Sequence, residues 1–498
     1  MSIILVLLVG TPLLAVAGCA VAPPRVAQAV TAASGLLTLG LALAVVPAAT
    51  HRTLTAVTYL RADALSVVFV MATGFLYAVA GVYSIGYLAA ERRAATDPAQ
   101  RAEFRRYSRR FHLGLNVFAW SMVCAPLVNG LALLWIAIEV TTVVSALLVA
   151  LDDTEEATEA AWKYVLLASC GLGIALLATI VMYAAGSTVL GSSYDLAFEP
   201  LVAAAKSLPA TPVRLAFLLA VLGFGTKVGL VPVHTWLPDA HAQAPTPVSA
   251  LLSGSLLATS FYAILRYFQI AQGTLGPSFP RNVLLIFGVA SLALAALYVL
   301  DQQDLKRFLA YSSVEHMGIL AIGVSFGGPV AMAGVLLHVL AHAAAKGNAF
   351  LGAGVLVQRF GTREIGRIRS AVTSLPWSAP LFVAAALALC AMPPFGLFRS
   401  EFQIVTGGLA QQRGIGAVIL VVLVTVAFLG ITATTTRMIL GPGDRDAGVL
   451  APIGEPSRWM VVPVVCGLLV LLVLGVHPPQ ALVELIDAGV GQLQGGIG

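Results

Sequence analysis

Apolar runs of about 20 residues recur from one end of this 498-residue chain to the other. A helix of about 20 apolar residues crosses a hydrocarbon core of about 30 Å and satisfies its own backbone polar groups while doing so. Only 10% of the residues are charged, against roughly 25% in a typical soluble domain. The chain has too little charge for a water-facing surface, so we predict an all-α integral membrane protein.

We expect about 14 transmembrane helices, because each apolar run is long enough for one crossing. An even number of crossings places both termini on the same side of the membrane. The expected spans are residues 2–20, 28–49, 63–88, 111–128, 130–150, 160–185, 212–232, 246–269, 282–300, 304–326, 329–357, 375–405, 414–437 and 459–477.

Arginine gathers in two of the stretches between these spans. Seven arginines lie between residues 91 and 110 and four between 358 and 370, and both stretches fall on one face in this arrangement. Because positively charged loops stay in the cytoplasm, we expect that face inside and both termini outside, in a membrane of the bacterial inner-membrane type. This orientation accounts for the net charge of +5, so no nucleic-acid partner is expected.

Ionisable residues fall inside several expected spans, where a charge costs about 2.5 to 3.5 kcal/mol. Lysine can release its proton when it is desolvated, whereas arginine in practice cannot. A nearby carboxylate would hold such a lysine protonated, and a carboxylate that moved away would let the proton leave. We therefore interpret these residues as proton-translocation candidates, with static salt bridges between helices as the alternative. They are Lys163, Lys227, Lys346, Glu139, Glu315 and Glu401.

Histidines extend this set along one helix. His338, His342 and Lys346 stand at positions i, i+4 and i+8, which places them on one helical stripe. Two histidines at that spacing can bind a metal, but no third ligand accompanies them in the sequence. We therefore expect a titratable row and no metal, with simple packing as a further alternative. His316, beside Glu315, extends the row.

Prolines interrupt two of the spans next to these residues. Pro232 and Pro238 follow Lys227, and Pro393 and Pro394 precede Glu401. Each proline removes a backbone hydrogen bond, and non-helical backbone survives at membrane depth only inside protein or beside a watery cavity. We expect discontinuous seventh and twelfth helices, each with an ion site beside its break.

The two breaks also predict an internal repeat. They are the seventh and the twelfth spans, five places apart, and because five is odd the broken helices cross the membrane in opposite directions. We expect four regions: residues 1–110 with helices 1 to 3 and a basic cytoplasmic loop, 111–270 and 281–440 as two inverted five-helix repeats, and 455–498 with helix 14.

Cofactor motifs are missing from the sequence. The five cysteines are scattered without a CxxC pair, which gives no indication of an iron–sulfur cluster or a zinc site. Neither a dinucleotide fingerprint nor a P-loop is found. We expect no cofactor in this chain, and another subunit carries the electrons if electrons move in the system.

Three stretches resemble the antiporter-like subunit family that respiratory complex I, multisubunit sodium/proton antiporters and group 4 membrane-bound nickel–iron hydrogenases share. They are HTWLPDAHAQAPTPVSALLSG at 234–254, DLKRFLAYSSVEHMG at 304–318 and AHAAAKGN at 341–348, and the resemblance runs from about residue 63 to 440. Within the family, EAAWKY at 159–164 and the Glu-His of YSSVEHMG are most similar to the F-type membrane component of hydrogenase-4.

The resemblance implies a 14-helix fold with discontinuous helices 7 and 12. It implies that Glu139 is the fifth-helix glutamate, Lys227 the seventh-helix lysine and Glu401 the twelfth-helix residue, and that Lys346 belongs to a central relay with His338 and His342. One departure concerns Ala258, which stands where a relay lysine or histidine is usual, with only Ser255, Thr259 and Ser260 nearby. Either water bridges the two halves or they are uncoupled.

The resemblance also implies what the chain does and with whom. We expect a proton-translocating, non-redox subunit of an oxidoreductase complex, most similar to a membrane-bound hydrogenase. Its partners would be other antiporter-like and small membrane subunits, hydrogenase-like and iron–sulfur peripheral subunits, and the lipid bilayer. The alternatives are a subunit of a cation/proton antiporter, which uses the same fold, and a structural membrane anchor that does not pump.

Overall fold

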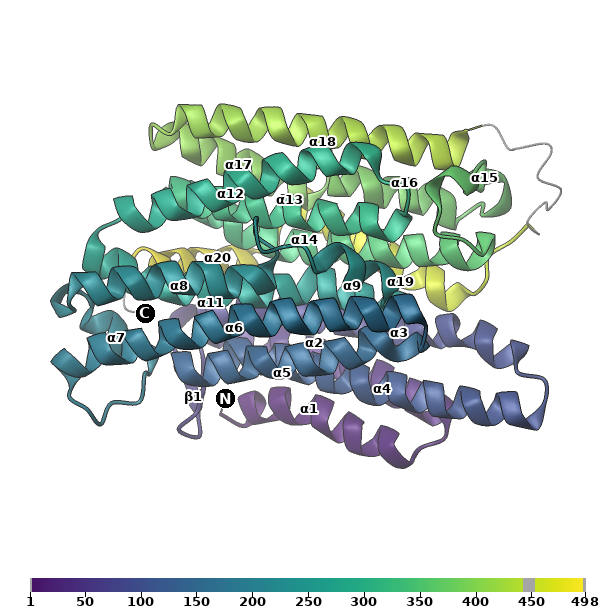
Figure 1. Ribbon diagram of the computed structural model, residues 1–498, viewed down its shortest axis with the longest axis horizontal. Coiled ribbons are helices and arrows are strands. Elements are labelled where there is room, and N and C mark those ends of the chain that lie inside the picture. The colour runs from purple at the N-terminus through teal and green to yellow at the C-terminus, as the bar shows by residue number, and fades with distance from the viewer. Residues whose placement is uncertain (1, 442–452, 496–498) are drawn as a thin grey trace.

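The computed structural model describes residues 2–441 and 453–495, and this part of the chain is almost entirely helical (Figure 1). Twelve of the described helices are long and apolar enough to cross a membrane. Two more crossings are made by α4 (Pro98–Leu127), whose first half is polar, and by the broken pair α16 (Ser378–Leu389) and α17 (Gly396–Ala410). The chain is a multi-pass membrane protein, and the prediction of about 14 spans is confirmed.

The first half of the chain ends with α11. Its elements are α1 (Ser2–Val21), α2 (Pro24–His51), the antiparallel strands β1 (Leu54–Ala56) and β2 (Leu60–Ala62), α3 (Ala64–Ala94), α4, α5 (Leu131–Val149), η1 (Ala150–Asp152), α6 (Glu155–Leu190), α7 (Phe198–Ala203), η2 (Ala205–Ser207), α8 (Ala210–Val228), α9 (Leu237–Gln243), α10 (Thr246–Leu251), the π-helical turn η3 (Leu252–Leu256) and α11 (Leu257–Leu275).

The second half begins with α12. Its elements are α12 (Ser278–Tyr298), η4 (Val299–Asp301), α13 (Leu305–Phe326), α14 (Gly328–Phe360), η5 (Ile365–Arg367), α15 (Ala371–Ser374), α16, α17, α18 (Gly414–Leu440), α19 (Arg458–Val476) and α20 (Gln480–Leu493).

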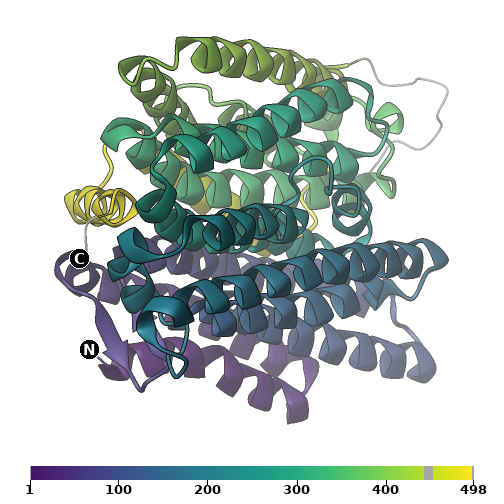
Figure 2. The same ribbon diagram turned by 60° about the vertical axis from the view of Figure 1, so that its left-hand side comes forward.

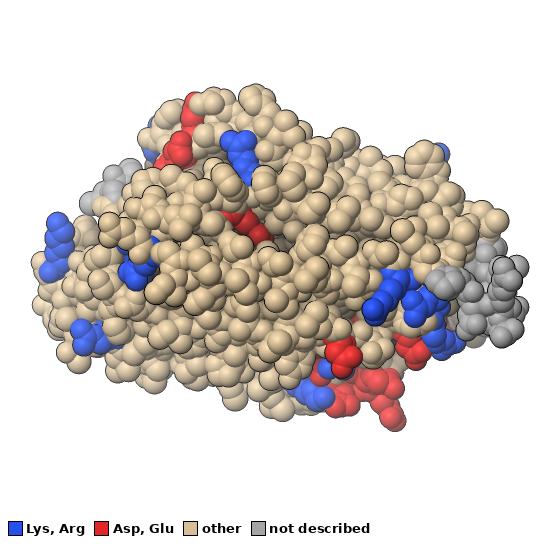
Figure 3. Space-filling model, turned by 90° about the horizontal axis from the view of Figure 1, so that it is seen from above, with Lys and Arg blue, Asp and Glu red and all other residues tan. Residues whose placement is uncertain are grey.

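The spans run roughly side by side along the long axis, with the first half on one side of the bundle and the second half on the other (Figures 1 and 2). Helix α14 lies centrally, because it packs against α13, α16, α17 and α19 and also against α3 and α10 from the first half. Both chain ends lie at one end of the bundle, and the turn between α3 and α4 lies at the other (Figure 1). Charged side chains form a few separate groups on the face in Figure 3, and other residues make up most of that surface.

Side-chain caps fix where several of the spans begin. The carboxylate of Asp63 accepts from the Ser66 amide at 2.8 Å before α3, and the hydroxyl of Thr154 accepts from the Ala157 amide at 3.1 Å before α6. Asp304 does the same for the Lys306 amide at 2.8 Å before α13. Such residues replace the missing carbonyl partners of the first helical amides, so the sequence itself sets these boundaries.

The basic stretch 91–110 is not a loop, which corrects the expected domain description. Helix α3 continues to Ala94 and α4 already begins at Pro98, so only a short turn separates them. Asp97 caps α4 by accepting from the Gln100 amide at 2.8 Å, and Pro98 occupies the first helical position. Hydropathy marks only the part of a helix that lies in hydrocarbon, so it missed the polar end of α3 and the polar start of α4.

A second helix, α20, follows α19 in the range 455–498, where one helix was expected. Its buried residues Leu482, Leu485, Ile486 and Val490 follow a helical spacing and form one apolar face. This face packs against α2, α3 and α14. At 14 residues α20 is too short for a crossing, which explains why hydropathy did not mark it.

Candidate functional site

Lys227 lies in the last turn of α8, and its side chain is fully buried. Its Nζ donates to Oγ1 of Thr142 on α5 at 2.8 Å and to the hydroxyl of Tyr164 on α6. The Tyr164 hydroxyl is 2.7 Å from Oγ of Ser145. No carboxylate in the described chain forms an ion pair with Lys227, and its side-chain hydrogen bonds go to hydroxyl groups.

Glu139 lies on the same helix as Thr142 and was predicted to work with Lys227. It is close enough to Lys227 to interact through charge, but the two do not form an ion pair in the structure. Its Oε2 is buried, with no hydrogen-bond partner among the described residues. A buried carboxylate oxygen needs a proton, a water or a moving partner to satisfy it. The structure therefore brings Glu139 and Lys227 together without fixing them to each other.

The chain breaks directly after Lys227, as expected from Pro232. Gly229 ends α8 with a positive φ of 83°, and Pro232 lies in the non-helical segment before α9. Pro238 lies in the first turn of α9. The indole of Trp236 donates to the Thr226 carbonyl at 2.7 Å and so satisfies an oxygen that the break leaves free. The prediction of a discontinuous seventh helix is confirmed.

Lys346 lies near the middle of α14 and is fully buried as well. Its Nζ donates to Oγ of Ser312 at 2.5 Å and to the Leu309 carbonyl at 3.0 Å. Glu315, one turn further along α13, is close enough to interact with Lys346 through charge, and its Oε2 has no partner among the described residues. Lys346 and Glu315 thus repeat the arrangement of Lys227 and Glu139.

The three predicted histidines meet beside Lys346. His316 Nδ1 lies 3.1 Å from His338 Nε2, and His338 Nδ1 lies 3.0 Å from Oγ of Ser400. The ring centres of His316 and His342 are 5.1 Å apart, and neither ring nitrogen of His342 has a partner in the described chain. The sequence placed His338 and His342 on one stripe and extended the row to His316, and the structure brings His316 of α13 beside both.

Glu401 follows the second break and joins this histidine cluster. Helix α16 ends at Leu389, and residues 390–395, which include Pro393 and Pro394, are not helical. Glu401 Oε1 lies 4.0 Å from His316 Nδ1. The prediction of a discontinuous twelfth helix is confirmed, and the break places its carboxylate against a neighbouring helix.

Lys163 is not buried, which corrects its predicted place inside a span. Its side chain is 49% exposed, and its Nζ pairs with Glu159 at 2.7 Å and with Asp239 at 3.4 Å. Helix α6 begins at Glu155 rather than at residue 160, so Lys163 lies near its start. Successive helix residues point about 100° apart, and the inward position belongs to its neighbour Tyr164.

Among the three hydroxyl groups around Ala258, Thr259 Oγ1 is buried without a partner in the described chain, and the other two have partners. Ser255 Oγ lies 2.7 Å from Thr73 Oγ1, and Ser260 donates back to its own helix. The contact toward Lys346 comes instead from Ser253, whose Oγ is 2.7 Å from Oγ of Ser313. Ser313 and Lys346 donate to the same Leu309 carbonyl. Sequence reasoning missed Ser253 because the π-helical turn η3 rotates it toward α13.

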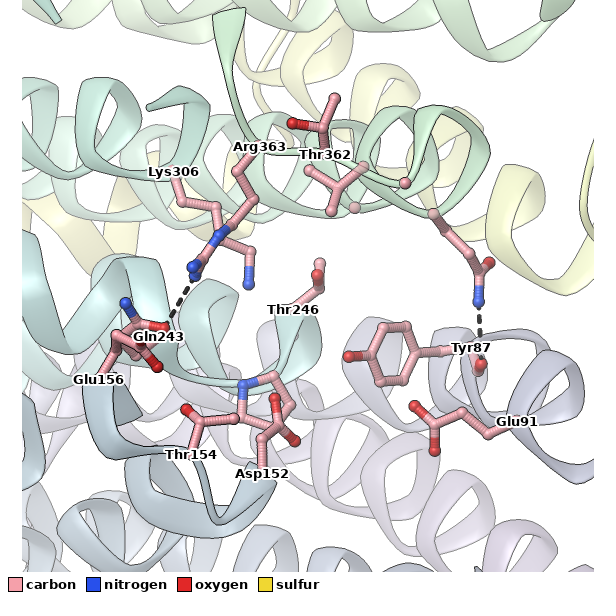
Figure 4. Close-up of a pocket in the computed structure, with 15 residues that line it drawn as sticks. Tyr87, Glu91, Asp152, Thr154, Glu156, Gln243, Thr246, Lys306, Thr362 and Arg363 are labelled. Carbon is pink, nitrogen blue, oxygen red and sulfur yellow. Dashed lines mark hydrogen bonds between the residues drawn. The ribbon is translucent and has the colours of Figure 1, made fainter. Parts of the chain in front are cut away.

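A cavity of about 650 Å³ lies at the end of the bundle where α3 ends and the arginine-rich start of α4 follows. Figure 4 shows Lys306 and Arg363 on one side of it and Asp152 on the other, with Glu91 beside Tyr87. Lys306 Nζ donates to the Ala244 carbonyl at 2.7 Å. The cavity is lined by charged groups from both halves of the chain.

His241 lies between this cavity and Lys346. It is fully buried on α9, within charge range of both Lys306 and Lys346. Its Nδ1 is 2.8 Å from the Leu237 carbonyl, and its Nε2 has no partner among the described residues. Sequence reasoning did not single out His241, although it lies in the HTWLPDAHAQ motif beside the first break.

A bundle of about 14 spans, with two broken helices and buried lysines, glutamates and histidines beside the breaks, defines an antiporter-like membrane subunit. The chain belongs to the family described as NADH:quinone oxidoreductase/Mrp antiporter, whose family model matches residues 128–429. It is 32% identical over 423 residues to the hydrogenase-4 component F homolog of Methylacidiphilum infernorum (isolate V4), a match that covers 85% of this chain and 86% of that protein.

Two solved structures have the same fold. A chain of the Mrp complex from Dietzia sp. DQ12-45-1b superposes with a TM-score of 0.82 at 21% identity and covers 99% of this chain and 96% of its own length. A chain of respiratory complex I from Thermus thermophilus with bound NADH superposes with a TM-score of 0.81 at 23% identity, with coverage of 98% and 99%. At these identities the likeness extends to the fold alone.

Proposed function

We propose that this chain carries protons across the membrane as the antiporter-like subunit of a redox-driven complex. The observation that carries the proposal is the setting of Lys227 and Lys346. Both are fully buried, both contact only hydroxyl or carbonyl oxygens, and each has a glutamate within charge range. A lysine held in this way changes its proton affinity when the carboxylate moves, without loss of packing. A proton switch needs this property.

The proposed uptake route starts at the cavity of Figure 4. Lys306 lines that cavity, and His241 lies within charge range of both Lys306 and Lys346. Beyond Lys346, the histidine cluster leads to Glu401 on α17. In this route, ordered water bridges the gaps between these side chains. The route joins one end of the bundle to the middle of the membrane and then to the second broken helix.

Two inverted repeats, residues 111–270 and 281–440, supply one lysine switch each in this proposal. Each repeat contains one broken helix, and the two broken helices cross in opposite directions. No hydrogen bond within the described chain joins the Lys227 cluster to the Lys346 cluster. Coupling between the halves therefore requires water near Ser253 and Ser313 or a movement of helices.

The likeness to a hydrogenase-4 component F homolog supports a complex of the membrane-bound hydrogenase type. The partners are then other antiporter-like and small membrane subunits and peripheral hydrogenase-like and iron–sulfur subunits, which hold the redox cofactors. We propose a bacterial-type inner membrane with both termini outside, because the arginine-rich end then faces the cytoplasm.

A subunit of a sodium/proton antiporter is the second candidate, and the shared fold with a chain of an Mrp complex favours it. Copurification separates the two. Peripheral iron–sulfur and hydrogenase-like proteins are expected for the redox complex, and only small membrane partners for the antiporter. A pure membrane anchor would tolerate loss of both buried lysines.

Lys227→Ala and Glu139→Gln test the proposal in the assembled complex in membrane vesicles. Each is expected to lower donor-driven proton uptake by about 10²-fold or more, since positioned proton-transfer groups contribute on that order. Uptake is followed with a pH-sensitive dye, and assembly by copurification. Lys206→Ala, which removes an exposed lysine, is the matched control. Wild-type uptake in both variants, with assembly intact, would refute the proposed function.

A further inference from the structure

Three helices bring together a set of side chains that can hold a metal ion. His316 of α13, His338 of α14 and Glu401 of α17 place one ligand atom each within 4.8 Å of one another. The side chains of His316 and Glu401 are 1% and 11% exposed, and His338 is fully buried. A third ligand for the histidines was not evident along the chain, because Glu401 lies more than 60 residues from His338.

Hydrogen bonds determine which nitrogen of His338 is free to coordinate. Ser400 Oγ donates its proton to the Leu397 carbonyl at 2.9 Å, so toward His338 Nδ1 at 3.0 Å it accepts. His338 therefore carries its proton on Nδ1, and Nε2 presents a lone pair toward His316. Ligating histidines are commonly held in this way by a hydrogen bond from the second nitrogen.

His316 supplies the second nitrogen. Without a metal its Nδ1–H donates to His338 Nε2 at 3.1 Å. Its Nε2 has no partner among the described residues, so the proton can move to Nε2 and leave a lone pair on Nδ1. One proton leaves Nδ1 and one is taken up at Nε2, so the imidazole stays neutral. Two imidazole lone pairs and the Glu401 carboxylate then face one point.

We propose that His316, His338 and Glu401 form a Zn²⁺ site of the two-histidine, one-carboxylate type. Ligand atoms around a tetrahedral zinc lie about 3.3 Å apart, from zinc–ligand distances of about 2.0 to 2.2 Å. The distances of 3.1 Å between the two nitrogens and 4.0 Å between His316 Nδ1 and Glu401 Oε1 bracket this value. Water fills the fourth position, as in open zinc sites.

The site lies on the proposed route beyond Lys346, so a bound ion blocks it. A coordinated imidazole has no free lone pair with which to accept a proton at that nitrogen. Zn²⁺ therefore inhibits proton transport through the second half, and this consequence, unlike the binding itself, rests on the proposed function. Glu401 is the most exposed of the three ligands, with 11% of its side chain accessible.

Co²⁺ replaces Zn²⁺ in such sites and reports tetrahedral coordination through its visible absorption. We expect the purified full-length chain in lipid nanodiscs to bind one Co²⁺ with a tetrahedral band that Zn²⁺ displaces. Glu401→Gln and His338→Gln should abolish the band. Ser400→Ala, which removes only the orienting hydrogen bond, should weaken affinity by about 10- to 100-fold. His112→Gln replaces a buried histidine on α4 and should leave the band unchanged.

If the wild-type chain shows no tetrahedral band, the site is overturned and only a hydrogen-bonded histidine pair remains. If the band survives in Glu401→Gln and His338→Gln, the site is overturned as well, and the binding is adventitious. X-ray absorption at the zinc edge supplies a second measurement, because it reports the ligands around the bound zinc. A zinc ion without two imidazole ligands would also overturn the proposed site. A normal band in a complex that does not transport protons would overturn the proposed function and leave the metal site standing.

Discussion

Buried ionisable side chains in this protein are of two kinds, those with an ion partner in contact and those without. Asp63 belongs to the first kind, with Arg61 at 2.5 Å and Arg266 at 2.7 Å. Burial alone would raise the pKa of Asp63, but the guanidinium groups of Arg266 and Arg61 hold it well below its usual range. Lys227 and Lys346 belong to the second kind. We infer that the first kind fixes structure and the second kind exchanges protons.

The Asp63 cluster yields a prediction about stability. Asp63→Asn should lower the free energy of unfolding by about 3–5 kcal/mol, because removal of one partner leaves Arg266 buried and unpaired. The lowered pKa of Asp63 also stabilises the folded protein in a pH-dependent way. This stabilisation is fully present at pH values above the unfolded-state pKa of about 3.9, and it is lost as the pH falls toward the folded-state pKa. Thermal unfolding in detergent measures both effects. The control is Asp153→Asn at an exposed aspartate, and equal melting temperatures for the two variants would contradict the prediction.

Helices α6 and α8 show how an element positions the site. They approach closely enough that a Cβ on Gly223 would lie 2.5 Å from the Ala175 amide nitrogen, and one on Gly171 would lie 2.5 Å from Thr226. Gly223 stands one turn before Lys227 on α8, and Tyr164 projects from α6. The contact between Lys227 and Tyr164 therefore depends on small residues at this crossing.

Gly223→Ala tests that dependence. The added methyl group meets backbone rather than a flexible side chain, so we expect a loss of about 1–3 kcal/mol in stability and a lower rate of proton transport. Gly173→Ala adds the same methyl group to α6 where nothing lies within 4 Å, and it should leave both quantities unchanged. Thermal unfolding and dye-based proton uptake provide the measurements. A wild-type melting temperature for Gly223→Ala would show that the crossing is not tightly packed.

At the scale of the whole molecule, one end of the bundle carries the arginine-rich ends of α3 and α4 and the charged cavity, and the other carries both chain ends (Figures 1 and 4). The charge difference between the ends favours the first in the cytoplasm. The stretch around residue 195, between α6 and α7, lies at the end with the termini (Figure 1). In the proposed route, orientation and uptake are linked, because the cavity would take up protons from the side of the membrane that it faces.

Impermeant thiol labelling in intact cells checks this orientation. Exposed positions are available at both ends, and we expect labelling of Asp195→Cys but not of Asp97→Cys. Cys170 and Cys466, which are exposed on the chain, are first replaced by serine to remove background. Permeabilised cells, in which both variants should react, control for reactivity. Labelling at position 97 and none at 195 in intact cells would reverse the topology and place the cavity outside.

The amino-acid sequence by itself determined the fold class, the approximate spans and the two breaks. These features arise along a single segment: about 20 apolar residues define a crossing, and a proline removes a hydrogen bond of its own helix. The sequence also indicated which ionisable residues lie in apolar surroundings, with Lys163 as the exception. That error came from the boundary, since hydropathy gives no rotation of the helix and did not show that α6 begins at Glu155.

Only the tertiary structure decided which side chains meet. His316, His338 and Glu401 come from three helices, and Tyr164, Thr142 and Ser253 are ordinary residues until packing turns them toward a lysine. The rotation of each helix about its own axis is set by close contacts with its neighbours, such as the glycine crossing of α6 and α8. The apolar pattern of one span carries no information about those contacts, because lipid and neighbouring helices are equally apolar surroundings for it.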